Sequence, residues 1–127
     1  QIQKLEQKSL QADADDFEPL KEEIEFNDFS KIDIRAGRIL EAEKVEKSNK
    51  LMKLQVDIGF ETRTIVSGIA NDFKAEELAG QSVCVAANLA PKPLMGIESN
   101  GMILMAEEAN GTLKFIETEA KPGSKIS

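Results

Sequence analysis

From Phe26 onward, short apolar segments recur along the chain at intervals of about ten residues, with turn-forming residues between them. Within residues 51–59 (LMKLQVDIG), apolar side chains at 52, 54, 56 and 58 alternate with polar ones at 53, 55 and 57, and residues 31–46 begin in the same way. This alternation is typical of a strand that buries one face. The regular spacing of such segments predicts an all-β fold, either a sandwich or a barrel.

The remaining segments narrow the choice of fold. Residues 61–69 and 82–89 are predicted as a third and a fourth strand, and residues 101–108 and 113–118 as two more, joined by an Asn110-Gly111 turn. Between the third and fourth strands, the Glu76-Glu77 pair and the terminator Gly80 predict one short helix. This element order is that of an OB-fold, a five-stranded Greek-key barrel with its helix between strands 3 and 4.

Gly37 lies in the middle of the first predicted strand. A glycine inside a strand usually marks a bulge or a sharp coil. A bulge at this position would change which side chains share a face of the strand. We therefore expect Arg38 to lie on the same face as Arg35.

The first part of the chain has a different texture. Residues 1–26 contain eight acidic and three basic residues and only a weak helical pattern of apolar side chains. Because such an acidic segment cannot bury much apolar surface, we predict a linker with nascent helix. The predicted organisation is an acidic linker over 1–26 and an OB-fold domain over 27–127. Because the chain begins with Gln1, we expect it to be a piece of a longer protein.

The composition excludes several classes of function. The chain contains no His, so a Ser-His-Asp triad and a Cys-His zinc site are both impossible within it. We therefore expect no metal, no cofactor and no enzyme in this domain itself. The single Cys84 rules out an internal disulfide framework and favours a reducing compartment. No apolar run is long enough to span a membrane, so we expect a cytoplasmic protein without a membrane partner.

The segment from Asn88 to Ala106 (NLAPKPLMGIESNGMILMA) is unusually stiff and polar for a connection between two strands. Its two prolines restrict the backbone, and its glycines permit turns that other residues resist. A rigid loop at a barrel rim can present donors, acceptors and a polarisable methionine to RNA. The RNA contacts predicted from this segment are Asn88, Lys92, Ser99, Asn100, Gly101 and Met102.

A structural role would account for the same residues equally well. Prolines and glycines are turn residues first, and a loop that closes the barrel would have a similar composition. Asn88 could be an asparagine at a strand end that hydrogen-bonds the loop backbone. From the residues alone, both interpretations stay open.

Basic residues gather in one part of a chain whose net charge is −7. Residues 31–53 contain seven bases and four acids, and the local field matters more than the total for an anionic partner. We predict a cationic patch on the first two strands, with Ser67 and Arg63 of the third strand as weaker candidates. The patch residues are Lys31, Arg35, Arg38, Lys50 and Lys53. The alternative is a solvated surface on which these bases are balanced by neighbouring glutamates.

Three stretches in order carry a family resemblance: residues 33–59, residues 63–70 (RTIVSGIA) and residues 75–106. They resemble the tRNA-binding domain of aminoacyl-tRNA synthetases, and the match covers about residues 28–127. The form most similar is the C-terminal domain of bacterial methionyl-tRNA synthetases, the methionine-tRNA ligases. The resemblance implies an OB-fold with extra C-terminal strands that dimerise two copies. It implies tRNA and the catalytic domain of the parent synthetase as partners.

The family also contains a free-standing dimer and resembles a small secretion-related chaperone of the same fold. The leading hypothesis is therefore a non-catalytic module that grips the tRNA body with little sequence preference. The alternative is a dimeric OB-fold module that binds protein. One departure from the family is Pro93, where other members often carry a basic residue, so Lys92 stands alone in its loop and a modest affinity is expected.

Overall fold

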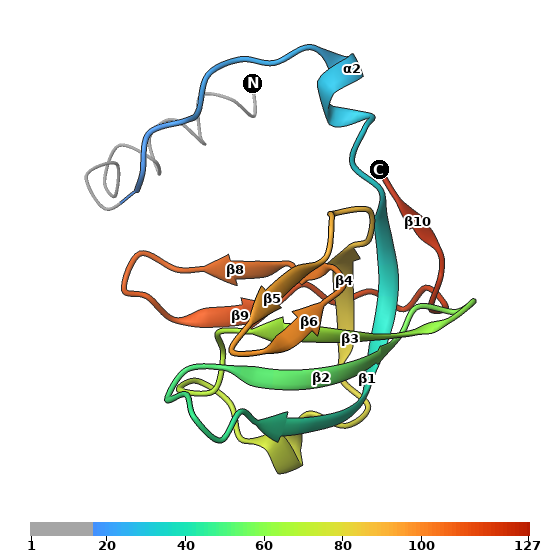
Figure 1. Cartoon of the computed structure of the whole chain (residues 1–127). Helices are drawn as coiled ribbons and strands as arrows, with labels where there is room; N and C mark the ends of the chain where they lie inside the picture. The colour runs from blue at the N-terminus through green and yellow to red at the C-terminus, as the bar shows by residue number, and fades with distance from the viewer. Residues whose placement is uncertain (1–16) are drawn as a thin grey trace.

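The computed structural model describes residues 17–127, which form a nearly closed five-stranded barrel with very little helix (Figure 1). Its strands are β1 (Ile34–Lys44), β2 (Met52–Asp57), β3 (Thr62–Ser67), β4 (Ser82–Ala86) and β7 (Met102–Ile103). They are ordered β3-β2-β1-β4-β7, and β3 lies against β7 so that the sheet almost closes on itself. The predicted OB-fold is confirmed.

The core follows from the alternation read in the sequence. In β2, Met52, Leu54 and Val56 are fully buried while the residues between them are half-exposed. Each such side chain contributes roughly 1.5–3 kcal/mol when it leaves water. Ile65 of β3 and Val85 of β4 meet them inside the barrel. The predicted period-two strand therefore buries the face that the sequence indicates.

β1 is long and strongly curved because it serves two neighbours. Its first half, up to Arg38, pairs with β4, and its second half pairs with β2. The predicted bulge at Gly37 is wrong, since Gly37 pairs regularly with Val83. The register shifts instead between Ile39 and Glu41. Gly37 is small for another reason: a Cβ there would lie 3.1 Å from Cγ1 of Val56, so the glycine lets β1 bend over the core.

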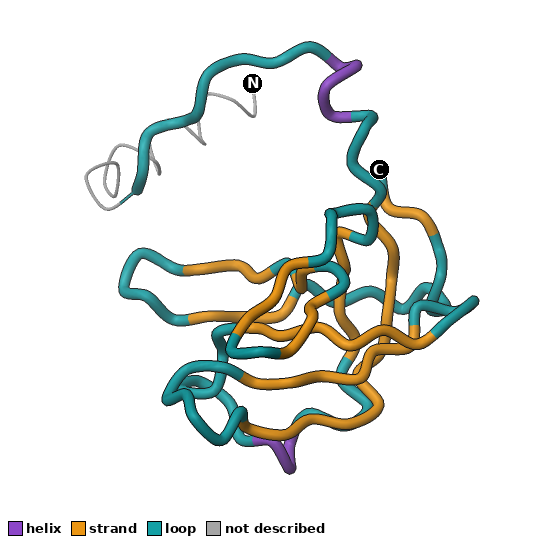
Figure 2. The backbone as a smooth tube through the Cα atoms, viewed as in Figure 1, coloured by secondary structure: helices purple, strands orange, loops and turns teal. Residues whose placement is uncertain are grey.

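A single 3-10 turn, η2 (Ala75–Glu77), stands between β3 and β4, which confirms the predicted short helix. Glu77 accepts a hydrogen bond from the backbone N–H of Lys74 at the start of this turn. Leu78 follows it and is almost completely buried at one end of the barrel. The turn thus closes the bottom of the core (Figure 2).

Two hairpins accompany the barrel: the hairpin of residues 105–115 projects from it, and the hairpin of residues 92–99 lies against β3 (Figure 1). The hairpin of β8 (Met105–Glu107) and β9 (Leu113–Phe115) has the predicted turn at Asn110-Gly111. The hairpin of β5 (Lys92–Leu94) and β6 (Ile97–Ser99) was not predicted and lies inside the segment 88–106. Its turn places Met95 at φ 50° and Gly96 at φ 80°. The loop is therefore stiffened by strand pairing as well as by its prolines.

A C-terminal strap, residues 118–126, binds the barrel from outside. Its last strand, β10 (Lys125–Ile126), pairs with the start of β1. The hydroxyl of Ser82 donates a hydrogen bond to the carbonyl of Thr118, and the N–H of Gly123 donates to the carbonyl of Ala36. The strap runs past the outer side of β1 and β4, where Ala36 and Cys84 are buried.

An N-terminal arm, residues 17–33, stands away from the barrel and contains the short helix α2 (Phe26–Phe29) (Figure 1). Of the linker with nascent helix predicted over residues 1–26, residues 1–16 lie outside the described residues, and residues 17–25 are not helical. The proposed division at residue 26 stays a prediction, and the first barrel strand begins at Ile34. None of the helices in residues 17–127 is long and apolar enough to cross a membrane.

Candidate nucleic-acid interface

OB-folds bind oligonucleotides on the face of their second and third strands and on the loops that follow strands 1 and 4. In this chain that face is the outer side of β2 and β3 with the adjoining part of β1, called the ligand face below. Residues that pair across an antiparallel sheet share a face, so the register defines its members. Lys53 pairs with Glu43 on one side and with Val66 on the other. Asp57 pairs with Arg38, four residues further along β2. Arg38 and Lys53 therefore share this face but lie at its two ends.

Lys53 borders a cleft between the β1–β2 turn and the tip of the β5–β6 hairpin. The cleft has a volume of about 530 Å³. Ser48 and Asn49 come from the turn, Lys44 from β1 and Ile97 from the hairpin. Two glutamates, Glu43 and Glu46, also line it. This cleft, called the turn cleft below, brings cations and amide groups together next to competing carboxylates.

The β5–β6 hairpin is fixed to β3 by hydrogen bonds rather than by its turn alone. Ser99 is 5% exposed, and its Oγ accepts a hydrogen bond of 2.9 Å from the N–H of Val66. The same hydroxyl donates to the carbonyl of Gly101 at 3.2 Å. The N–H of Asn100 donates to the carbonyl of Thr64 at 2.8 Å. Since the predicted RNA contact Ser99 spends its hydroxyl on the backbone, the structure gives it an anchoring role.

The packing of the fold also explains why residue 101 is a glycine. Its φ is 121°, and a Cβ at this position would lie 3.2 Å from the carbonyl oxygen of Ala86 and 3.3 Å from Cγ1 of Val85. The sequence predicts that this glycine lets an RNA backbone approach closely. The close neighbour in the structure is strand β4, so packing against β4 alone requires a glycine.

Beside the hairpin lies a groove of about 630 Å³ that gathers many of the predicted contacts. Met102 and Lys92 are exposed at its edge, and Ser67 is half-buried. Apolar side chains of Leu89, Leu94 and the strand β3 complete its walls. The predicted contacts that line this hairpin groove are Ser67, Lys92, Ser99, Gly101 and Met102.

Asn88 lies just after β4 and hydrogen-bonds backbone groups, as the structural interpretation predicts, but these groups belong to the arm and not to the loop. Its Nδ2 donates a hydrogen bond to the carbonyl of Lys31 at 2.7 Å, and its Oδ1 accepts one from the N–H of Asp33 at 2.9 Å. Asn88 thus holds the arm where it joins β1. Asn100 lines a polar cleft of about 510 Å³ with Arg63.

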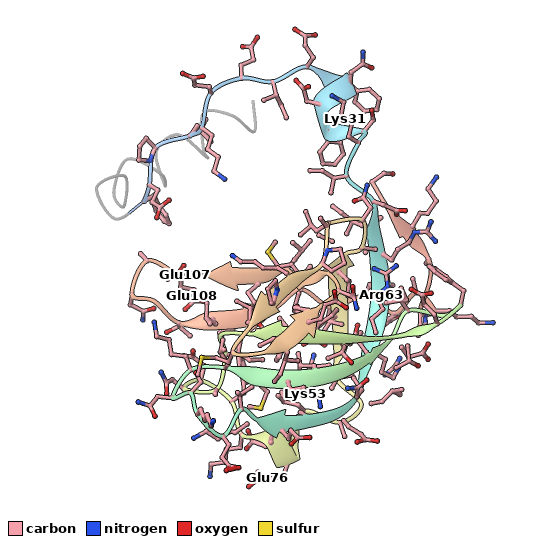
Figure 3. The ribbon with its side chains drawn as sticks, in the orientation of Figure 1. Lys31, Lys53, Arg63, Glu76, Glu107 and Glu108 are labelled. Carbon is pink, nitrogen blue, oxygen red and sulfur yellow. The ribbon has the colours of Figure 1, made fainter. Side chains whose placement is uncertain are left out.

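The five predicted cations do not form one patch. Lys31 lies in the arm and Lys53 on the opposite part of the molecule (Figure 3). β1 is 11 residues long, and Lys53 pairs with Glu43 near its far end, eight residues beyond Arg35. Lys50 lies in the turn before β2, with its carbonyl accepting a hydrogen bond from Ala70. The length and curvature of β1 separate side chains that neighbour one another in the sequence.

Arg35 is held by groups of the protein itself. Its Nε donates to Oδ1 of Asp33 at 2.7 Å, its Nη1 donates to the carbonyl of Gly123 at 3.1 Å, and its guanidinium lies 5.4 Å from the ring centre of Phe60. The hydrogen bond from Arg35 lowers the pKa of the Asp33 carboxyl, against its desolvation, and Lys125 and Arg63 lower it further. Arg38 similarly donates to the carbonyl of Gly80.

Sequence reasoning missed Lys125 altogether and treated Arg63 only as a weak candidate. Lys125 belongs to a strand of two residues, which is too short to leave a periodic pattern. Arg63 donates to the carbonyl of Ala87 and to Glu61, and so ties β3 to the start of the segment 88–106.

The titratable side chains of the described part of the chain are the candidates for metal ligands and for nucleophiles. Within residues 17–127, no three His, Cys, Asp or Glu side chains are placed to hold a metal ion. Burial raises the pKa of the Cys84 thiol, which disfavours the reactive thiolate. The arrangement offers hydrogen-bond donors, cations and an apolar groove on a rigid barrel, and so it defines a binding module.

Comparison with known proteins agrees with this class. The model of the family described as a putative tRNA-binding domain matches residues 34–125. This match covers well over half of the chain, so the chain belongs to this family of tRNA-binding domains.

Relatives and solved structures place the chain more closely. The methionine–tRNA ligase of Parabacteroides distasonis is 56% identical over 110 residues, which are 85% of this chain and 16% of that protein. The chain thus spans less than a fifth of the length of the curated relatives it matches. A MetRS-related protein from Pyrococcus horikoshii superposes with a TM-score of 0.79 at 38% identity, covering 84% of this chain and 100% of that one. A CsaA chaperone protein from Picrophilus torridus gives 0.75 at 31% identity, covering 83% and 100%.

Proposed function

We propose that this chain is the tRNA-binding appendage of a methionyl-tRNA synthetase, which holds the body of the tRNA through phosphate and ribose contacts with little sequence preference. One observation carries the proposal. The β5–β6 hairpin lines both the hairpin groove, with Lys92 and Met102 at its edge, and the turn cleft, with Lys53. This hairpin belongs to the connection between the fourth and fifth barrel strands, which OB-folds use to bind oligonucleotides.

The two clefts supply different kinds of contact. In the turn cleft, Lys53 and Lys44 meet phosphates as point charges, and Asn49 offers an amide to phosphate or ribose oxygens. In the hairpin groove, Met102 presents a polarisable apolar side chain to a ribose or a base. Ser99 and Gly101 act indirectly, because they fix the hairpin that shapes both clefts.

The proposal also explains how a protein with a net charge of −7 serves a polyanion. Binding to the isolated domain is expected to be modest, since the glutamates of the turn cleft compete with phosphate for its cations. A module joined to a catalytic domain needs only modest affinity. A short flexible linker between the two domains raises the effective concentration of tRNA near the catalytic domain to roughly the millimolar range.

The test is a tRNA titration at two salt concentrations with Lys53→Ala. Each phosphate contact that is lost makes the slope of log K against log salt shallower by about 0.9. We therefore expect weaker binding to every tRNA alike and a shallower salt dependence. Lys74→Ala is the matched control, because Lys74 is an exposed lysine next to η2 that lines neither cleft. Equal affinities for Lys53→Ala and the unchanged protein would remove the turn cleft from the proposed site.

We further propose that the chain forms a homodimer in the cytoplasm and works beside the catalytic domain of its parent synthetase. The names of the relatives support the parent. The β8–β9 hairpin, which stands off the barrel, supports dimerisation through C-terminal strands. Sedimentation equilibrium of the chain measures the subunit count, and a monomer at all concentrations would contradict the dimer.

A second candidate function is protein binding. It is favoured by the apolar walls of the hairpin groove and by the name of the structural neighbour called a chaperone. Competition between tRNA and an unfolded peptide discriminates between the two functions. tRNA binding that survives a large excess of peptide favours the first proposal.

A further inference from the structure

Another cleft lies where α2, the start of β1 and the end of β10 come together, and it shares no lining residue with the turn cleft or the hairpin groove. Its volume is about 560 Å³, which falls within the range of roughly 300–1,000 Å³ typical of small-ligand sites. Its walls combine aromatic and cationic side chains. The residues that matter for the argument are Phe26, Phe29, Lys31, Asp33, Arg35 and Lys125. We call it the α2 cleft.

The two phenylalanines of the α2 cleft present their rings to water. Phe26 is 77% exposed and Phe29 is 38% exposed. Residues three apart on a helix are neighbours on its surface, and both phenylalanines line the same cleft. Two exposed aromatic rings that line one cleft offer a flat surface on which an aromatic ring of a ligand can stack.

The rings stand on a fixed base. Asn88 binds the backbone of the arm through Lys31 and Asp33, on either side of Ile32. Within the arm, the N–H of Ile32 donates to the carbonyl of Phe29 at 3.1 Å, and Asp28 accepts from the N–H of Glu25 at the start of α2. The cleft is thus built into the fold, and a ligand would not have to order the arm first.

The charge of the α2 cleft is opposite to that of the protein. Three cations line it, namely Lys31, Arg35 and Lys125, and the acidic side chain among the lining residues is Asp33. Asp33 is already paired with Arg35 at 2.7 Å. Lys31 reaches Asp28 only at 3.9 Å with both side chains well exposed, a contact of little strength. Lys31 and Lys125 therefore remain as charges for an anionic ligand.

We propose that the α2 cleft binds an unpaired nucleotide of the RNA, with its base stacked on Phe26 or Phe29 and its phosphate beside Lys31 and Lys125. The proposal rests on the proposed tRNA-binding function and extends the RNA contact beyond the ligand face. Exposed aromatic rings next to cations are the means by which proteins hold single-stranded nucleic acid. A base-paired stem cannot use the rings, since its bases are already stacked.

The experiment titrates the whole chain with a labelled single-stranded oligoribonucleotide of six residues and, separately, with tRNA. Stacking contributes a factor of roughly 5 to 150 per base, so Phe26→Ala/Phe29→Ala should weaken hexamer binding at least about fivefold. Phe17→Ala is the control, because Phe17 is an exposed ring of the arm that does not line the cleft. Lys125→Ala should weaken hexamer binding and flatten its salt dependence, while Lys121→Ala on the same strap should change neither.

Three results would overturn the proposal in distinguishable ways. If the unchanged chain binds neither tRNA nor hexamer, the proposed function itself fails. If the unchanged chain binds tRNA, and the double phenylalanine variant binds the hexamer as tightly as the unchanged chain does, the α2 cleft is excluded as a nucleotide site while the proposed function stands. Sedimentation of that variant gives the third result. If the double phenylalanine substitution lowers the subunit count and Lys125→Ala leaves the hexamer affinity unchanged, the α2 cleft is an interface between two copies of the chain.

Discussion

At the scale of single residues, the hydroxyl of Ser99 anchors the segment 88–106 to β3. Ser99→Ala removes the acceptor of the Val66 N–H, and a buried donor left without a partner costs about 1–3 kcal/mol. We expect this loss in the free energy of unfolding in urea, together with weaker tRNA binding as the hairpin loosens. Ser67→Ala, on the half-exposed neighbour in the same groove, should stay within about 0.5 kcal/mol. Weaker tRNA binding at unchanged stability would instead make Ser99 a direct contact.

The same residues show what a sequence reveals at this scale. The residue types in the segment 88–106 were informative, since Ser67, Lys92, Ser99, Gly101 and Met102 do gather in one groove. Their separate roles could not be predicted, because a serine hydroxyl serves a backbone N–H or a ligand equally well. Which one it serves depends on β3, which lies 33 residues earlier in the chain.

At the scale of elements, the strap on the barrel depends on a close approach between glycines of two segments. Gly59, in the β2–β3 turn, has a φ of 95°, and a Cβ on it would lie 2.4 Å from the carbonyl oxygen of Pro122. Gly111 has a similar φ of 91° with open space around it. Gly111→Ala should therefore cost only the backbone strain of about 1–2 kcal/mol, and Gly59→Ala clearly more. Urea unfolding midpoints compare the two, and equal losses would mean that the strap moves away freely.

The predictability of each element follows its length and pattern. The strands β2 and β3 could be predicted because six residues each display an alternation or an apolar run. β5 and β6 have three residues each, and Pro91 and Pro93 interrupt the pattern there. β10 has two residues and owes its existence to β1. The bulge was assigned to Gly37 rather than to the region of Leu40, because a glycine in a strand can indicate either a bulge or close packing.

At the scale of the whole molecule, the question is whether total charge or local field governs RNA binding. Glu43→Gln/Glu46→Gln and Glu76→Gln/Glu77→Gln both change the net charge by the same two units. The first pair lines the turn cleft beside Lys53, and the second lies on η2 and lines neither the turn cleft nor the hairpin groove. A carboxylate acts over about 10 Å at 0.1 M salt, so only charges near the bound phosphates matter there.

We therefore expect the first variant to bind tRNA several-fold more tightly than the unchanged chain at low salt, because phosphate no longer competes with Glu43 and Glu46 for the cleft cations. The η2 variant should bind nearly as the unchanged chain does, and all three affinities should converge as salt rises and screens the fields. Titrations at three salt concentrations measure both effects. If both variants increase the tRNA affinity equally, the net charge of the whole protein limits binding, and the two glutamates of the turn cleft have no particular effect.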